Sequence, residues 1–135
     1  MNIVLDTNVL IAAFISHGTC SETLEHCIRY YNLITSQYIL NEFRDNLILK
    51  FKFSILEVTE ALELLKSRMI IVSPSPIPKN ICKDSKDLPV IGTAVKGKCR
   101  YIITGDNDLL RLKKYNEITI LTPNDFLKSE HRISK

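Results

Sequence analysis

The order of the apolar segments constrains the fold of this chain more than any other feature of its sequence. Short runs rich in Ile, Leu and Val alternate with longer stretches of helical periodicity. The runs lie at 3–5, 33–35, 69–72, 101–104 and 118–120. Strands joined by helical crossovers pair in parallel and need helices on both faces. The sequence therefore predicts the α/β class, as a three-layer α/β/α sandwich around a mostly parallel sheet of four to five strands.

Polar residues with capping chemistry mark where the helices between these strands begin. Thr19 with Glu22, and Ser54 with Glu57, have the spacing of a capping box, and Ser36 is a single N-cap candidate. The expected helices cover about 8–15, 19–30, 36–50, 54–68, 85–96 and 108–114, and a last helix begins at Pro123.

Length and composition predict one globular domain over 1–135, with a polar tail at 128–135 that we expect to fray. No C-x-x-C pair occurs among the four cysteines, which favours free thiols over a zinc site. No export signal is recognised, and no apolar run approaches the roughly 18 residues of a membrane helix. We therefore expect a cytoplasmic protein that does not enter a membrane.

Acidic residues follow two of the predicted strands directly. Asp6 comes after the strand at 3–5, and Asp106 and Asp108 come after the strand at 101–104. An Asp at such a turn is often only a helix cap. Ligands of open parallel sheets, however, bind beyond the carboxyl ends of the strands.

Other acids reach the same edge of the sheet from helices. Glu42 lies about two turns into the helix after the second strand, and Asp84 and Asp87 flank the start of the helix at 85–96. A helix N-terminus favours Asp in any protein, so an ordinary capping role stays open for both. Together, however, the acids come from four separate segments and map to the same edge of the sheet.

Carboxylates packed this closely repel one another or take up protons unless a cation neutralises them. Ligands that are all oxygen atoms suit Mg²⁺ or Mn²⁺. Such ions activate water and stabilise the leaving oxygen in phosphodiester hydrolysis. The net charge of +3, from 18 Lys and Arg against 15 Asp and Glu, permits a nucleic-acid ligand without demanding one.

These segments, taken in order, resemble the PIN-domain family over essentially the whole chain. The matching stretches are 3–10 (IVLDTNVL), 40–43 (LNEF), 82–87 (CKDSKD), 101–110 (YIITGDNDLL) and 121–127 (LTPNDFL). The resemblance implies a PIN-like α/β/α sandwich that cuts RNA endonucleolytically with Mg²⁺ or Mn²⁺. It implies catalytic metal ligands at Asp6, Glu42, Asp87 and Asp106, and supporting roles for Asn8, Thr104 and Asp108.

Within that family, the chain is most similar to small stand-alone toxins of toxin–antitoxin systems, of the VapC-like kind. That similarity implies a homodimer and a small antitoxin protein as partners. Family members often carry two adjacent acids where this chain has Lys86 and Asp87. This departure leaves open whether Asp84 or Asp87 is the ligand, and whether Asp84 or Asp108 also binds metal.

Two rival functions are weighed against this one. A phosphohydrolase of the haloacid-dehalogenase type needs an Asp nucleophile and commonly a second Asp two positions later, where this chain has Asn8. A PIN-like module that binds RNA or protein without cutting would be expected to lack one of the four acids, and none is missing.

Basic and apolar residues indicate where partners bind. The candidate RNA contacts are Lys83, Lys86, Arg111, Lys113 and Lys114, with Arg44 as a weaker one. Large apolar residues on the helices at 36–50 and 54–68 exceed what one sheet face needs, so some are expected to be exposed for a homodimer or an antitoxin helix. These residues are Ile48, Leu49, Phe51, Phe53, Leu62 and Leu65.

Overall fold

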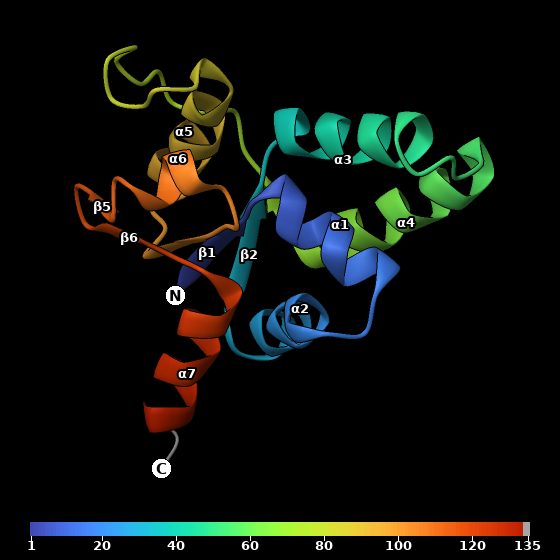
Figure 1. Cartoon of the computed structure of the whole chain (residues 1–135), viewed down its shortest axis with the longest axis horizontal. Coiled ribbons are helices and arrows are strands. Elements are labelled where there is room, and N and C mark those ends of the chain that lie inside the picture. The colour runs from blue at the N-terminus through green and yellow to red at the C-terminus, as the bar shows by residue number, and fades with distance from the viewer. Residues whose placement is uncertain (134–135) are drawn as a thin grey trace.

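The strands form one sheet in the computed structural model, which describes residues 1–133 (Figure 1). The six strands of this part of the chain are β1 (Asn2–Leu5), β2 (Asn32–Thr35), β3 (Met69–Ile71), β4 (Tyr101–Ile103), β5 (Lys114–Tyr115) and β6 (Ile118–Leu121), in the order β3-β2-β1-β4-β6-β5. All neighbours pair in parallel except β5, which is antiparallel to β6. The predicted α/β class with a mostly parallel sheet is confirmed, with one strand more than expected.

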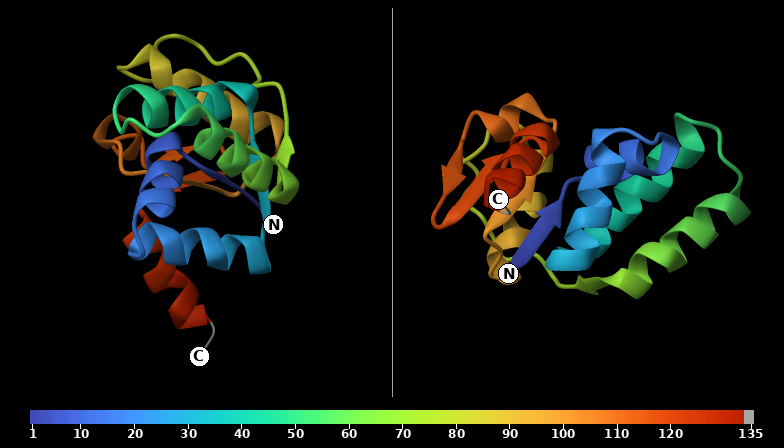
Figure 2. Two further views of the ribbon diagram at one scale, coloured as in Figure 1. Left: turned by 90° about the vertical axis from the view of Figure 1, so that its right-hand side faces the viewer. Right: turned by 90° about the horizontal axis from the view of Figure 1, so that it is seen from below.

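Helices separate the strands, as predicted, and cover the sheet. The helices are α1 (Thr7–Ile15), α2 (Thr19–Tyr30), α3 (Gln37–Leu49), α4 (Ile55–Arg68), α5 (Leu88–Lys96), α6 (Asn107–Leu110) and α7 (Pro123–Ile133), with a 3-10 turn η1 (Ser85–Asp87) directly before α5. Helix α5 packs on β1, β2 and β4, while α2 packs on β2 and α4 on β3. Figure 2 shows α1 to α4 gathered on one side of β1 and α5 with α6 on the other. The arrangement is the expected α/β/α sandwich.

Local capping chemistry explains where several helices begin. Ser54 and Glu57 form the predicted capping box, since each side chain accepts a hydrogen bond from the other residue's backbone N–H, at 3.1 and 3.0 Å. Ser36 caps α3 as predicted. The capping box predicted at Thr19 is wrong, because Gly18 is the N-cap and no side chain bonds there.

The segment after β4 differs from the predicted helix at 108–114. Helix α6 ends at Leu110, and Lys113 adopts a left-handed conformation with a φ of 60°. The chain then enters β5, whose Lys114 and Tyr115 pair with β6. A second left-handed residue, Asn116, makes the turn of this hairpin.

The central strands are buried on both faces, which explains their uninterrupted apolar sequences. Ile3, Val4 and Leu5 of β1 are at most 2% exposed, and Ile102 and Ile103 of β4 are fully buried. The four cysteines are free thiols, as predicted. Among the described residues, no helix combines the length and apolarity that crossing a membrane requires.

The last helix is fixed to the body of the protein by a half-buried acid, Glu130. Helix α7 packs against α2 (Figure 1), and its Glu130 accepts hydrogen bonds from the Tyr31 hydroxyl at 2.6 Å and the His26 Nε2 at 2.9 Å. Helix α7 extends over 128–133, the described part of the segment that we expect to fray. Positions 134 and 135 lie outside the described residues.

Candidate metal centre

Asp6 is held rigidly at the carboxyl end of β1. It caps α1, and its Oδ1 accepts a hydrogen bond from the Thr7 N–H at 2.8 Å. Its Oδ2 accepts from the Thr104 hydroxyl at 2.7 Å and from the Asn8 side-chain amide at 3.2 Å. Only 5% of Asp6 is exposed. Three donors thus fix both carboxylate oxygens.

Asn8 and Thr104 also connect Asp6 to the turn after β4. The Asn8 Oδ1 accepts a hydrogen bond from the Gly105 N–H, and the Thr104 Oγ1 accepts one from the Asp106 N–H, both at 3.0 Å. The supporting positions expected for Asn8 and Thr104 match these contacts. Because the Asn8 amide bridges β1 and β4, the position where a haloacid dehalogenase would carry its second acid is occupied by a neutral linker.

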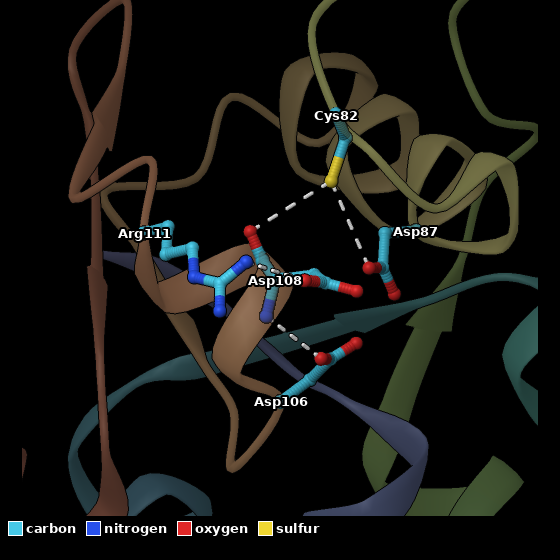
Figure 3. Close-up of polar contacts among 5 residues, drawn as sticks. All are labelled: Cys82, Asp87, Asp106, Asp108 and Arg111. Atoms are coloured by element: carbon cyan, nitrogen blue, oxygen red, sulfur yellow. Dashed lines mark hydrogen bonds and ion pairs between the residues drawn. The ribbon is translucent and has the colours of Figure 1, made fainter.

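Asp106 and Asp108 lie at the start of α6. Asp106 caps this helix by accepting a hydrogen bond from the Asp108 N–H at 3.0 Å (Figure 3). The Asp108 carboxylate is paired with the Arg111 guanidinium at 3.3 Å. Asp106 thus keeps one oxygen free of this cap, whereas Asp108 already has a cationic partner.

Asp84 and Asp87 come from the 3-10 turn before α5. The Asp84 Oδ1 caps this turn by accepting from the Lys86 N–H at 3.0 Å. Asp87 is 6% exposed and is the N-cap residue of α5, with Pro89 following inside the first turn. Pro89 is tolerated at this position because the first N–H groups of a helix have no partner within it. The turn moves the start of the α-helix beyond both acids.

The structure brings three of the four predicted ligands together. Carboxylate oxygens of Asp6, Asp87 and Asp106 lie within 4.8 Å of one another. A second group with the same spacing consists of Asp84, Asp87 and Asp108. Asp87 belongs to both groups, so it occupies the more central place of the two acids that the sequence left as alternatives.

Glu42 lies beside these groups and in neither of them. It is half-buried on α3, and its Oε1 accepts a hydrogen bond from the Thr7 hydroxyl at 3.1 Å. Asp6 and Glu42 are thus connected through one residue, Thr7, whose backbone N–H donates to Asp6 and whose hydroxyl donates to Glu42. Thr7 has a role here that the sequence analysis did not assign.

A single pocket of about 440 Å³ contains the acids at one end and a mixed wall at the other. Its acidic end is lined by Asp6, Glu42, Asp84, Asp87 and Asp106. The wall, which the sequence analysis missed, consists of Ile11, Ala12, Ile15, Asn46, Lys50 and Phe51. Asn46 and Lys50 follow Glu42 by four and eight residues, so helical spacing alone would have placed them on the same face.

Burial and mutual repulsion raise the pKa values of the acids. Burial raises the pKa of Asp6 despite its hydrogen bonds, and burial also raises the pKa of Glu42. The pKa of Asp87 rises to about 8 because of burial, a hydrogen bond with Asp106 and repulsion by neighbouring carboxylates. Bringing a divalent cation among these groups would relieve the repulsion.

The donor set fits a hard divalent cation. Every member of both groups is a carboxylate oxygen, as Mg²⁺ and Mn²⁺ prefer. No nitrogen or sulfur atom of residues 1–133 belongs to either group. Three acids in one pocket leave room for water or a phosphate oxygen as further ligands, so the site can bind a cation and a substrate together.

The predicted RNA-contacting residues are scattered around this pocket. Lys86 lines it, and its charge partly offsets the rise that burial causes in the pKa of Glu42. Arg111 is bound to Asp108, while Lys113 and Lys114 lie around the start of β5. Lys83 is exposed outside the lining. The cation that joins Lys86 in the pocket is Lys50.

Comparisons with known proteins agree with the fold. Residues 2–108 match the family model of the PIN domain. The fold is similar to VapBC2 from Rickettsia felis bound to a DNA fragment from their promoter, at 16% identity and a TM-score of 0.64 over 89% of this chain and 97% of that one.

It is also similar to VapBC-1 from nontypeable Haemophilus influenzae, at 17% identity and a TM-score of 0.64, covering 92% of this chain and 99% of that one. FitAcB from Neisseria gonorrhoeae aligns at 19% identity and a TM-score of 0.58, covering 90% and 97%. No curated protein matches the chain by sequence.

The raised pKa of Asp87 predicts how stability depends on pH in EDTA. Asp87 ionises near its ordinary value of 3.8 when unfolded and at about 8 when folded, so the folded state binds more protons between these values. Stability is therefore highest below the unfolded pKa and is lost as the pH rises through about 8. We expect the free energy of unfolding, from urea titrations, to fall over this range less steeply for Asp87→Asn than for the wild type.

The slope should be reduced and not abolished, because the pKa values of Asp6 and Glu42 are raised as well. Asp125→Asn, an exposed acid in the first turn of α7, serves as the control and should follow the wild-type curve. Identical pH dependence in Asp87→Asn and the wild type would contradict this assignment.

Proposed function

Because the chain belongs to the PIN-domain family, we propose that it is a metal-dependent endoribonuclease and the toxin of a toxin–antitoxin pair. The observation that carries the proposal is the trio of Asp6, Asp87 and Asp106, whose oxygens converge within 4.8 Å inside one pocket. Phosphodiester hydrolysis is the chemistry that such a set of carboxylates serves best.

We assign the acids different roles according to the contacts that hold each of them. Asp6, Asp87 and Asp106 would hold Mg²⁺ or Mn²⁺, which when bound supplies activation of water and stabilisation of the leaving oxygen. Glu42, fixed by the Thr7 hydroxyl outside the trio, would orient water that enters the pocket. Asn8 and Thr104 keep Asp6 in place, and Asp108 shapes the first turn of α6.

RNA would lie along the pocket with its phosphates near the two lysines. Lys50 and Lys86 are exposed cations of the pocket lining, while Phe51 and Ile15, 45% and 44% exposed, offer an apolar surface between α1 and the end of α3. An exposed aromatic ring beside a cation suits an unpaired base and its phosphate. The substrate class favoured is therefore single-stranded RNA.

A small antitoxin and a second copy of the chain are the proposed protein partners. Three similar structures carry the names VapBC2, VapBC-1 and FitAcB, and the first two match the VapC-like kind of system indicated by the sequence. Of the apolar residues expected at a partner surface, Leu49 and Phe51 are exposed at 68% and 45%. The other four, Ile48, Phe53, Leu62 and Leu65, pack against the core. Ile55 and Leu56, at the start of α4, are also exposed.

Removing one ligand charge should abolish cleavage without disturbing the fold. Asp106→Asn keeps an oxygen that can cap α6, so the helix should be retained. We expect RNA cleavage in Mn²⁺ to fall by about 100-fold or more, since cation binding and transition-state stabilisation fail together. The measurement is single-turnover cleavage of a labelled single-stranded RNA, with Asp125→Asn as the matched acid outside the pocket.

Two results would contradict the nuclease assignment. One is wild-type cleavage by Asp106→Asn, and the other is undiminished wild-type cleavage in excess EDTA. RNA binding without cleavage at any concentration of Mg²⁺ or Mn²⁺ would instead support the non-cleaving module.

The pocket lysines, Lys50 and Lys86, should contribute more to RNA affinity than the sequence-predicted lysines outside the pocket lining. Lys50→Gln and Lys86→Gln should each weaken binding and lower the slope of log Kd against log salt by about one, as expected for one lost phosphate contact. Lys113→Gln, outside the pocket lining, should change neither quantity. Fluorescence anisotropy in EDTA measures binding without cleavage, and a larger loss in Lys113→Gln than in Lys50→Gln would refute the proposed path.

A further inference from the structure

The thiol of Cys82 lies between the Asp87 carboxylate and the backbone carbonyl of Asp108 (Figure 3). Cys82 is 7% exposed in the loop before η1. Its Sγ donates to the Asp87 Oδ2 at 3.7 Å and approaches the backbone carbonyl of Asp108 at 3.9 Å. The Cys82 side chain therefore contacts both the Asp87 carboxylate, at the start of α5, and the backbone of Asp108 in α6.

The Asp87 carboxylate is held differently from the carboxylates of Asp6 and Asp106. Asp6 accepts from three donors, and Asp106 accepts from a backbone N–H. Within residues 1–133, the side-chain hydrogen bond to the Asp87 carboxylate comes from the Cys82 thiol.

We propose that Cys82 is a positioning residue, whose thiol orients the Asp87 carboxylate toward the cation and sets its separation from Asp106. This role rests on the proposed metal-dependent function. A thiol suits it because S–H is a weak donor, so it fixes the direction of the carboxylate while leaving the negative charge available. A cationic donor such as the arginine that pairs with Asp108 would instead neutralise that charge.

The connection to α6 explains why the contact affects more than one ligand. Asp108 belongs to the same turn as Asp106, whose side chain accepts from the Asp108 N–H. A thiol that touches the Asp108 carbonyl and the Asp87 carboxylate therefore ties the start of α6 to the start of α5. Groups that hold a ligand in this way commonly change metal affinity by 10- to 100-fold when removed.

The test compares variants that keep or lose the donor. Cys82→Ala and Cys82→Val both remove it, and Val still fills the space, while Cys82→Ser restores a shorter donor. We expect the Mn²⁺ affinity, measured by isothermal titration calorimetry, to fall about tenfold or more in the Ala and Val variants and by less in the Ser variant. Cys99→Ala is the matched control, because that thiol is equally buried at 5% exposure and lines none of the acidic pocket.

Each outcome decides one statement. Wild-type Mn²⁺ affinity in folded Cys82→Ala or Cys82→Val, or a loss in Cys82→Ser as large as in those variants, would overturn the positioning role. If Cys82→Ala does not fold, the comparison of Val with Ser decides alone. A wild type that binds no Mn²⁺ and cuts no RNA would refute the proposed function itself, whereas an active wild type with insensitive Cys82 variants would refute this inference only.

Discussion

Repulsion among carboxylates at the end of the parallel strands is the constraint on which the rest of this site depends. Asp6, Asp87 and Asp106 come from three segments far apart in the sequence, and their oxygens lie within 4.8 Å of one another. Burial, a hydrogen bond with Asp106 and repulsion by the neighbouring carboxylates together raise the pKa of Asp87 to about 8. The fold must therefore restrain each of these carboxylates against mutual repulsion. A bound cation would relieve the repulsion, which favours its binding.

The register of the sheet supplies most of that restraint. Leu5 of β1 pairs with Ile103 of β4, so the next residues, Asp6 and Thr104, emerge side by side. Their hydrogen bond of 2.7 Å and the hydrogen bond between Asn8 and Gly105 fix this part of the site to two buried strands. Ligands carried by rigid elements keep their geometry when a substrate binds. Asp87, by contrast, is carried by a loop and the 3-10 turn η1.

The sequence predicted most accurately the features that follow from strand ends. Asp6 and Asp106 could be placed because each lies within two residues of the end of an apolar run, and Asp87 because it lies at a helix start. Glu42 was predicted as an equal ligand, and α3 places it in the pocket lining beside Thr7, outside both groups of acids. Cys82 could not be found because no periodicity gives side-chain directions in a loop, and β5 is too short for a pattern. Lys50 was recoverable from its helical spacing relative to Glu42.

The most direct test of the account is to locate Mn²⁺ by anomalous diffraction in crystals of the wild-type protein soaked with the metal. The account predicts an ion contacted by carboxylate oxygens of Asp6, Asp87 and Asp106 at about 2 Å, the distance typical of hard divalent cations of this size. An Asp87 side chain still in contact with the Cys82 thiol would agree with the arrangement described here. A pocket without an ion at saturating Mn²⁺, or ions bound only to exposed acids elsewhere, would contradict the claim that these carboxylates form a metal centre.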